Sequence, residues 1–200
     1  QKLSSSGSRP CILNFASARH PGGGWLCGAM AQEECIARRS SLVLSLDGNP
    51  MYTRNAQNRN NPYYLDDVIY SPNVLVFKDD THRYLENKFE ISVVTAAAVN
   101  MRNLPSPNDE DTQKAVDGIM LRRVTRVLEI MACHGNKAII LGAWGCGAFG
   151  QDARRVASYF HRALFEPNRA CWFDDVVFAI YNDAQKQRVF EEVFADKLTA

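Results

Sequence analysis

Two glycine-rich segments constrain the fold of this chain more than any other feature of its sequence. The first, Gly22-Gly23-Gly24, follows the apolar run 11–16, and the second, residues 142–150, follows the apolar run 138–141. A helix-like stretch comes after each of them. A buried strand, a glycine turn and a helix in succession are typical of α/β units, whose ligands bind beyond the carboxyl ends of the strands. We therefore expect both glycine segments to lie at one edge of a sheet and to form a single site.

The remaining periodicity predicts an α/β domain with parallel central strands and helices on both faces. Strands are predicted at residues 11–16, 74–77, 89–99, 138–141 and 176–180, and helices at about 32–46, 109–134, 151–165 and 184–197. Residues 47–72 have the composition of a long polar loop, and loops of that length in compact domains are often functional. In this loop Tyr63 and Tyr64 either cover the site or pack on the sheet.

Length and composition indicate one ordinary globular domain. Of the 200 residues, 46% are hydrophobic and 22% are charged, and the net charge is +1. We expect this domain to span residues 11–200, after a flexible segment or truncation point at residues 1–10. The scattered charges argue against a nucleic-acid partner, which needs a basic stripe. No apolar run is long enough to span a membrane, and we expect a monomer.

The six cysteines form no C-x-x-C pair, and no Cys/His cluster has the spacing of a zinc site. Most of them lie inside apolar stretches, as buried and reduced thiols do. The sequence therefore predicts free thiols in a reducing compartment, either the cytoplasm or the nucleus.

The second glycine segment has the chemistry of a diphosphate-binding loop. Glycine allows backbone N–H groups to approach an anion closely, and a following helix N-terminus adds a favourable dipole. Residues 145–150 also fit the dinucleotide pattern G-x-G-x-x-G. That pattern requires an acidic residue about 20 positions later, after a second strand, whereas residues 165–168 lie at a predicted helix end. An NAD-dependent oxidoreductase is therefore disfavoured, and tight strand-to-helix packing remains the alternative interpretation of the loop.

Two consecutive glutamates, Glu33 and Glu34, begin the helix that follows the glycine triplet. Successive helical residues point roughly 100° apart, so the two carboxylates cannot do the same job. Glutamates in a first helical turn often serve only as partners of the helix dipole. Their position ten residues after the triplet favours a functional site instead.

The triplet Gly22-Gly23-Gly24, followed after seven residues by Gln32-Glu33-Glu34, resembles the signature of poly(ADP-ribose) glycohydrolases, a catalytic branch of the macrodomain fold. Residues 142–150 resemble the diphosphate loop of that family. Further segments resemble its shorter, bacterial-type members, so that the resemblance covers roughly residues 11–195: these are 13–18, 38–42, 68–72, 76–80 and 95–100.

The resemblance implies a macrodomain-like mixed central sheet with helices on both faces, and it implies roles for individual residues. Glu34 matches the catalytic acid. Glu33 and Asn14 match residues that hold the distal ribose, and Gln32 completes the signature. Gly22, Gly23 and Gly24 match the loop that closes over that ribose and the diphosphate.

The opposite wall of the ligand site is also implied by the resemblance. Tyr181 matches an aromatic residue that stacks near the adenine. The clamp facing the first loop consists of Gly145, Cys146, Gly147, Ala148 and Phe149. The implied substrate is an ADP-ribose polymer or an ADP-ribosylated protein, and the family requires neither a metal nor a cofactor.

The implied reaction is hydrolysis of the ribose–ribose O-glycosidic bond, which passes through an oxocarbenium-like state. Glycosidases usually place two carboxylates about 5–9 Å apart on either side of the bond. Adjacent helical glutamates cannot readily face one bond in that way, so we expect Glu34 to be the single acid and base. Two alternatives stay open: a hydrolase of mono-ADP-ribosylated proteins, and a non-catalytic ADP-ribose reader, which would have no need of the glutamate pair.

Overall fold

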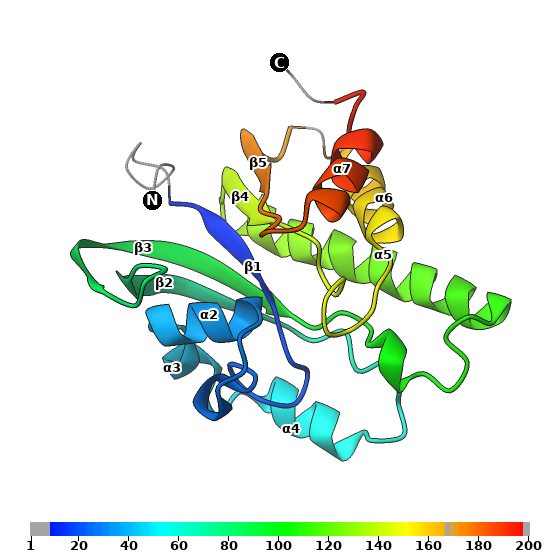
Figure 1. Ribbon diagram of the computed structural model, residues 1–200, viewed down its shortest axis with the longest axis horizontal. Helices are drawn as coiled ribbons and strands as arrows, with labels where there is room; N and C mark the ends of the chain where they lie inside the picture. The colour runs from blue at the N-terminus through cyan, green and yellow to red at the C-terminus, as the bar shows by residue number, and fades with distance from the viewer. Residues whose placement is uncertain (1–8, 167–168, 170, 198–200) are drawn as a thin grey trace.

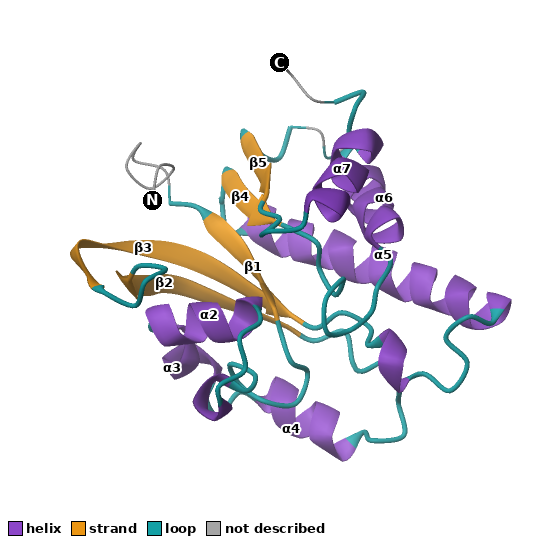
Figure 2. Ribbon diagram, viewed as in Figure 1, coloured by secondary structure: helices purple, strands orange, loops and turns teal. Residues whose placement is uncertain are grey.

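The computed structural model describes residues 9–166, 169 and 171–197, and its centre is a mixed five-stranded sheet (Figures 1 and 2). The strand order is β2-β3-β1-β4-β5. The strands are β1 (Cys11–Phe15), β2 (Val68–Lys78), β3 (Tyr84–Ala96), β4 (Ala138–Leu141) and β5 (Asp175–Phe178). β1 pairs in parallel with β3 and β4, β4 pairs in parallel with β5, and β2 runs antiparallel to β3. The predicted fold class, an α/β domain with a mixed sheet, is confirmed.

Helices cover both faces of this sheet (Figure 2). One face carries α2 (Gln32–Arg39), α3 (Leu42–Leu46) and α4 (Pro50–Gln57), and the other carries α5 (Glu110–Cys133), α6 (Ala153–Leu164) and α7 (Ala184–Val193). Short 3-10 turns, η1 (Trp25–Cys27) and η2 (Met101–Asn103), lie in the loops that follow β1 and β3. Among the described residues, none of the helices has the length and apolar character needed to cross a bilayer.

Each face of the sheet has its own hydrophobic core because side chains alternate along a strand. In β3, Val93 packs in the cluster with α3 and α4, whereas its neighbour Val94 packs in the cluster with α5 and α6. The sheet is therefore buried on both sides, as expected for a domain in which parallel strands predominate.

The segment between residues 32 and 78 differs from its prediction. The expected helix over 32–46 is two helices, which break at Ser40 because this residue bridges to Val76 on strand β2. The Ser40 hydroxyl also donates a hydrogen bond to the Ile36 carbonyl at 2.8 Å. A serine side chain can compete in this way with the backbone hydrogen bonds of a helix. The predicted loop 47–72 contains α4. Asn49 caps this helix, and Pro50 occupies its first turn, so the turn-like sequence there is a helix start.

The cysteines are free, as predicted, but most are not buried. Cys11 and Cys146 are buried, whereas Cys27, Cys133 and Cys171 are exposed.

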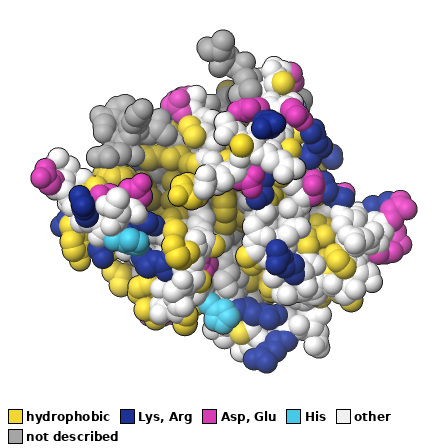
Figure 3. All heavy atoms as spheres, in the orientation of Figure 1, with side chains coloured by type: hydrophobic (Ala, Val, Ile, Leu, Met, Phe, Trp, Pro, Cys, Tyr) yellow, Lys and Arg dark blue, Asp and Glu magenta, His cyan; other side chains and the backbone are white. Residues whose placement is uncertain are grey.

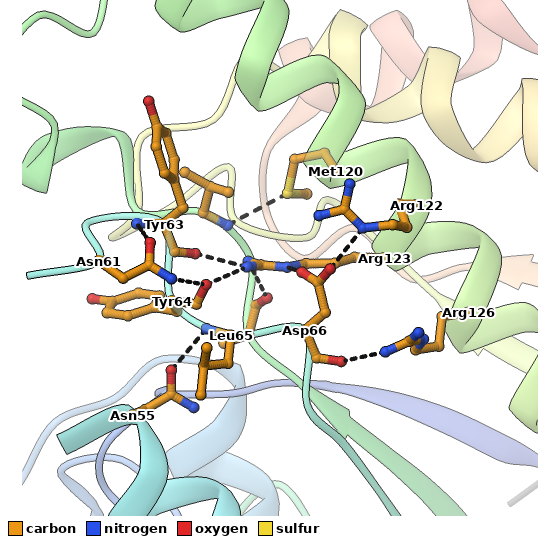
Figure 4. A network of polar contacts seen from close by, with 12 residues as sticks. Asn55, Asn61, Tyr63, Tyr64, Leu65, Asp66, Met120, Arg122, Arg123 and Arg126 are labelled. Atoms are coloured by element: carbon orange, nitrogen blue, oxygen red, sulfur yellow. Dashed lines mark hydrogen bonds and ion pairs between the residues drawn. The ribbon is translucent and has the colours of Figure 1, made fainter. Parts of the chain in front are cut away.

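A buried arginine, Arg123 of α5, attaches the loop before β2 to the sheet (Figure 4). Only 2% of its side chain is exposed. Its Nε donates to Asp66 Oδ1 at 2.7 Å, and its Nη groups donate to the carbonyls of Ala97 at 3.1 Å and Tyr63 at 2.7 Å. Partial burial opposes ionisation of Asp66, yet hydrogen bonds from Arg122 and Arg123 hold its pKa below the usual range. The apolar pattern of α5 gave no sign of this charged contact.

Arg123→Met should therefore destabilise the protein strongly, because removing one member of a buried ion pair leaves the other polar groups uncompensated. We expect the free energy of unfolding to fall by about 3–5 kcal/mol in urea denaturation. Arg122→Met is the matched control, since Arg122 contacts the same Asp66 from a position that is 54% exposed. Its loss should be below about 1 kcal/mol. Equal losses in the two variants would contradict this account of Arg123.

Candidate active site

A cleft of about 370 Å³ opens beyond the carboxyl ends of the parallel strands. Its walls come from residues 15–17 after β1, residues 30–34 at the start of α2, and residues 143–145 and 147–149 after β4. The face drawn in Figure 3 is hollowed near its centre, with hydrophobic side chains gathered along the hollow. The helix start that carries the two glutamates and the second glycine segment thus meet in one cavity.

Glu33 is held in the wall of the cleft by backbone and amide donors. Its Oε2 accepts a hydrogen bond from the Ser17 N–H at 2.7 Å, and its Oε1 accepts one from Asn14 Nδ2 at 3.3 Å. Burial raises the pKa of Glu33 to about 7, against the lowering effect of these donors, and the nearby Glu34 charge adds to the rise. Glu33 is therefore a group whose protonation changes near neutral pH.

Glu34 has a different environment from its neighbour, as expected from their angular separation on the helix. Its Oε1 accepts a hydrogen bond from the Gly24 N–H at 2.9 Å. Its Oε2 is buried and has no hydrogen-bond partner among the residues that the structure describes. Glu34 lines the cleft, so one oxygen is fixed by the loop while the other is buried and unpaired at the cleft wall.

The glycine triplet lies directly behind these carboxylates. Gly22 and Gly23 have φ values of 72° and 64°, a left-handed conformation that favours glycine. A Cβ atom placed on Gly23 would overlap Glu34 Oε1 and would lie 3.0 Å from Glu33 Oε2. None of the three glycines is part of the cleft lining. The triplet thus allows the helix carrying the glutamates to approach the loop after β1.

Gln32 and Asn14 bond to the protein itself. Gln32 Nε2 donates to the Leu13 carbonyl at 2.7 Å, and its Oε1 accepts from the Phe15 N–H at 2.8 Å. β4 pairs with β1 only at Cys11 and Ile12. The Gln32 amide therefore forms hydrogen bonds with backbone groups of β1 that lie beyond this pairing. Asn14 is fully buried and joins Glu33 to Thr95. Direct ligand contact by Gln32 and Asn14 stays a prediction.

The loop after β4 presents free backbone donors to the cleft. Six of its residues line the cavity, and within the described part of the chain the N–H groups of several of them donate no hydrogen bond, including those of Gly145, Gly147, Ala148 and Phe149. Two bonds anchor this loop to the segment after β3, from the Met101 N–H to the Phe149 carbonyl at 2.8 Å and from Gln151 Nε2 to the Val99 carbonyl at 2.7 Å. Successive unpaired N–H groups are suited to binding an anion.

Cys146 and Tyr181 take opposite positions around this loop. The Cys146 thiol is buried and does not line the cleft, and burial raises its pKa to about 12. Tyr181 follows β5 at the mouth of the cleft, where 94% of it is exposed. A large exposed aromatic ring at a cleft mouth suits stacking with a planar ligand group.

Several residues that shape the site carry no signal in the sequence. Ser17 contributes its backbone N–H, which any residue type has. The Trp144 side chain is fully buried, and its indole N–H donates to the Ala96 carbonyl at 3.2 Å. Arg38 donates to the carbonyls of Trp25 and Ala29 at 3.1 and 2.7 Å, which fixes the loop after the triplet. Contacts of these kinds depend on tertiary approach and not on sequence spacing.

The sheet order and the cleft between the start of α2 and the glycine-rich loop after β4 define a macrodomain-like protein, and comparison with known proteins is consistent with this class. The family model for the catalytic domain of microbial-type poly(ADP-ribose) glycohydrolase matches residues 1–79. No curated protein sequence matches the chain significantly.

Solved structures extend the similarity over nearly the whole chain. Poly(ADP-ribose) glycohydrolase from Thermomonospora curvata is 37% identical, with a TM-score of 0.89, over 96% of this chain and 71% of that one. The same protein bound to the inhibitor ADP-HPD is 39% identical, with a TM-score of 0.88, over 98% and 74%. The Deinococcus radiodurans protein in complex with ADP-ribose is 35% identical, with a TM-score of 0.89, over 98% and 80%. This chain belongs to the microbial-type poly(ADP-ribose) glycohydrolase family.

The environment of Glu33 predicts a pH dependence of stability. Its folded pKa of about 7 exceeds the ordinary value of 4.5, so the folded state binds its proton more tightly than the unfolded chain. Raising the pH through this window therefore lowers the free energy of unfolding, by on the order of 3 kcal/mol. Glu33→Gln cannot titrate and should lack this component in urea denaturation from pH 4.5 to 7. Parallel pH profiles of the two proteins would contradict the assignment.

Proposed function

We propose that this chain hydrolyses the ribose–ribose O-glycosidic bonds of poly(ADP-ribose) and releases ADP-ribose, with Glu34 as the single acid and base. The environment of Glu34 carries the proposal. One carboxylate oxygen is held by the Gly24 N–H, and the other has no partner among the described residues, at the wall of a cleft whose opposite wall has unpaired backbone N–H groups. Membership of the glycohydrolase family supports the same activity.

In the proposed complex, ADP-ribose lies along the cleft. The adenine stacks near Tyr181, and the diphosphate accepts hydrogen bonds from the unpaired N–H groups of residues 145 and 147–149. The distal ribose reaches Glu33 and Glu34. The cleft lining includes side chains at both ends of this path and the backbone loop between them, which supports one continuous site.

The proposed chemistry uses one carboxyl group twice. Glu34 donates its proton to the oxygen of the leaving ribose while the bond from that oxygen to the anomeric carbon breaks. The resulting carboxylate then takes a proton from water as the water oxygen attacks the oxocarbenium carbon, which restores the acid. Glu33 accepts hydrogen bonds from ribose hydroxyls and orients the sugar, and the negative diphosphate stabilises the developing positive charge.

Glu34→Gln should abolish the release of ADP-ribose from the polymer, because the amide can neither donate the proton nor accept one from water. We expect at least a hundredfold loss of kcat, in keeping with the roughly 10²–10⁴-fold contribution of general acid–base catalysis. ADP-ribose binding measured by calorimetry should survive, since Gln has nearly the same size and still accepts the Gly24 hydrogen bond. Near-normal turnover would overturn the role of Glu34.

Gly23→Ala should inactivate the enzyme by displacing the acid and not by general destabilisation. Its Cβ would overlap Glu34 Oε1, at a φ of 64°. Gly48→Ala is the matched control, because Gly48 has a φ of 70° with no atom near the added Cβ. Both variants should lose roughly 1–2 kcal/mol of stability from backbone strain. Only Gly23→Ala should lose polymer hydrolysis, and equal activities would show that the close approach is dispensable.

A further inference from the structure

The order of the strands gives the polymer a direction across the site. Tyr181 follows β5 at one edge of the sheet, the loop leading to Glu34 follows the central strand β1, and β3 and β2 lie beyond β1. If ADP-ribose spans the cleft from Tyr181 to Glu34, the polymer on the far side of the scissile bond must leave towards β3 and β2. This direction of the polymer rests on the proposed function.

Arg19 occupies that exit. It lies two residues after Ser17, whose N–H holds Glu33, and three residues before the glycine triplet. Its guanidinium carbon is 5.3 Å from the centre of the Tyr64 ring, and Tyr64 belongs to the loop before β2. The Tyr64 ring centre is 6.4 Å from that of Phe149, a residue of the cleft lining. Arg19 is therefore placed beside the tip of the clamp, outside the glutamate pair.

The ring beneath Arg19 is fixed from two sides. Asn103 Nδ2 donates to the Tyr64 hydroxyl at 3.0 Å. Arg123 Nη2 donates to the Tyr64 carbonyl at 3.1 Å (Figure 4). Tyr64 has a φ of 64°, an unusual conformation for a residue with a side chain, and these contacts hold it there. The platform under the Arg19 guanidinium is thus rigid, which reduces the entropy that binding a ligand would otherwise cost.

The Arg19 guanidinium has positive charge but no partner for it. Among residues 9–166, 169 and 171–197, no carboxylate pairs with this guanidinium and no acceptor takes a hydrogen bond from it, and its Nε is buried without a partner. Other arginines near the same loop are paired, since Arg54 binds Asp67 while Arg122 and Arg123 bind Asp66. An unpaired guanidinium beside a cleft for a polyanion has the fork of donors that phosphate oxygens match.

We infer that Arg19, seated on Tyr64, binds a phosphate of the ADP-ribose unit on the leaving side of the scissile bond. The cleft itself recognises the unit that is released, and Arg19 recognises the unit that stays on the polymer. Arg19 is therefore a specificity-determining residue that favours polymer over substrates whose leaving group lacks a phosphate.

The test compares two substrates that differ only on the leaving side. One is poly(ADP-ribose), and the other is ADP-ribose with an uncharged 4-nitrophenyl group on its distal ribose. Arg19→Gln keeps the stem over Tyr64 and removes the charge, and Arg19→Lys keeps the charge. We expect Arg19→Gln to lower kcat/KM for the polymer about tenfold, mainly through KM, and to change it less than twofold for the nitrophenyl compound. Arg19→Lys should recover most of the polymer activity.

Arg162→Gln is the matched control, because Arg162 is an exposed arginine on α6, away from the cleft lining. It should leave both activities unchanged. An equal loss of kcat/KM by Arg19→Gln on both substrates would show that Arg19 supports the clamp, and it would overturn the subsite. An unchanged kcat/KM on the polymer would also overturn the subsite. Failure of the wild-type protein to release ADP-ribose from either substrate would instead overturn the proposed function, so the two failures are distinguishable.

Discussion

Two carboxylates on consecutive residues are buried at the start of one helix, and the arrangement of the cleft depends on keeping them there. An isolated buried carboxylate is costly, so each must find donors nearby. Glu33 obtains them from Ser17 and Asn14, and Glu34 obtains one from Gly24. These donors are available only because the loop after β1 runs against α2 without intervening side chains. The helix N-terminus adds a favourable field for either carboxylate when it is ionised.

The position of α2 is fixed by contacts that extend the sheet. The pairing of β1 with β4 ends at Ile12. Beyond it, the Gln32 amide bonds to the Leu13 carbonyl and the Phe15 N–H, as a neighbouring strand would. The helix that carries the proposed acid is therefore attached to the sheet at its first residue. On the other side of the cleft, the loop after β4 is bound to the segment after β3. Both walls of the cleft are therefore attached to strands of the same sheet.

The sequence predicted the parts of the fold that rest on local pattern. The strand at Ala138–Leu141 and the long helix α5 follow from apolar period and a Gly stop, and the structure confirms them. The loop over residues 47–72 was predicted wrongly, because a capped helix start at Asn49-Pro50 has the composition of a turn. Arg123 was missed because a charged residue on an inner helix face gives no apolar signal, and its acceptors lie between 26 and 60 residues away in the sequence.

The site was predictable to the extent that its chemistry is encoded in side chains at fixed spacing. The glutamate pair and the glycine-rich loop after β4 are of this kind, and the structure brings them to one cleft, with the glycine triplet behind the glutamates. Their roles remain proposals. The backbone donors of Ser17 and the unpaired N–H groups after β4 are not encoded in this way, since every residue other than proline has an N–H. Direct contacts of Gln32 and Asn14 with a ligand could not be predicted reliably from spacing either, because the structure shows that their amides already bond within the protein.

The placement of Cys146 has a consequence for how the clamp behaves towards oxidants and electrophiles. A cysteine in a glycine loop before a helix is a setting in which thiols become reactive. Here the thiol turns into the core, and with its pKa raised to about 12 almost none of it is thiolate at neutral pH. Peroxide and alkylating reagents act on the thiolate, so they should spare the clamp and modify exposed thiols such as Cys133 and Cys171 first. Those two positions can therefore carry spectroscopic labels while the phosphate-binding loop stays chemically intact.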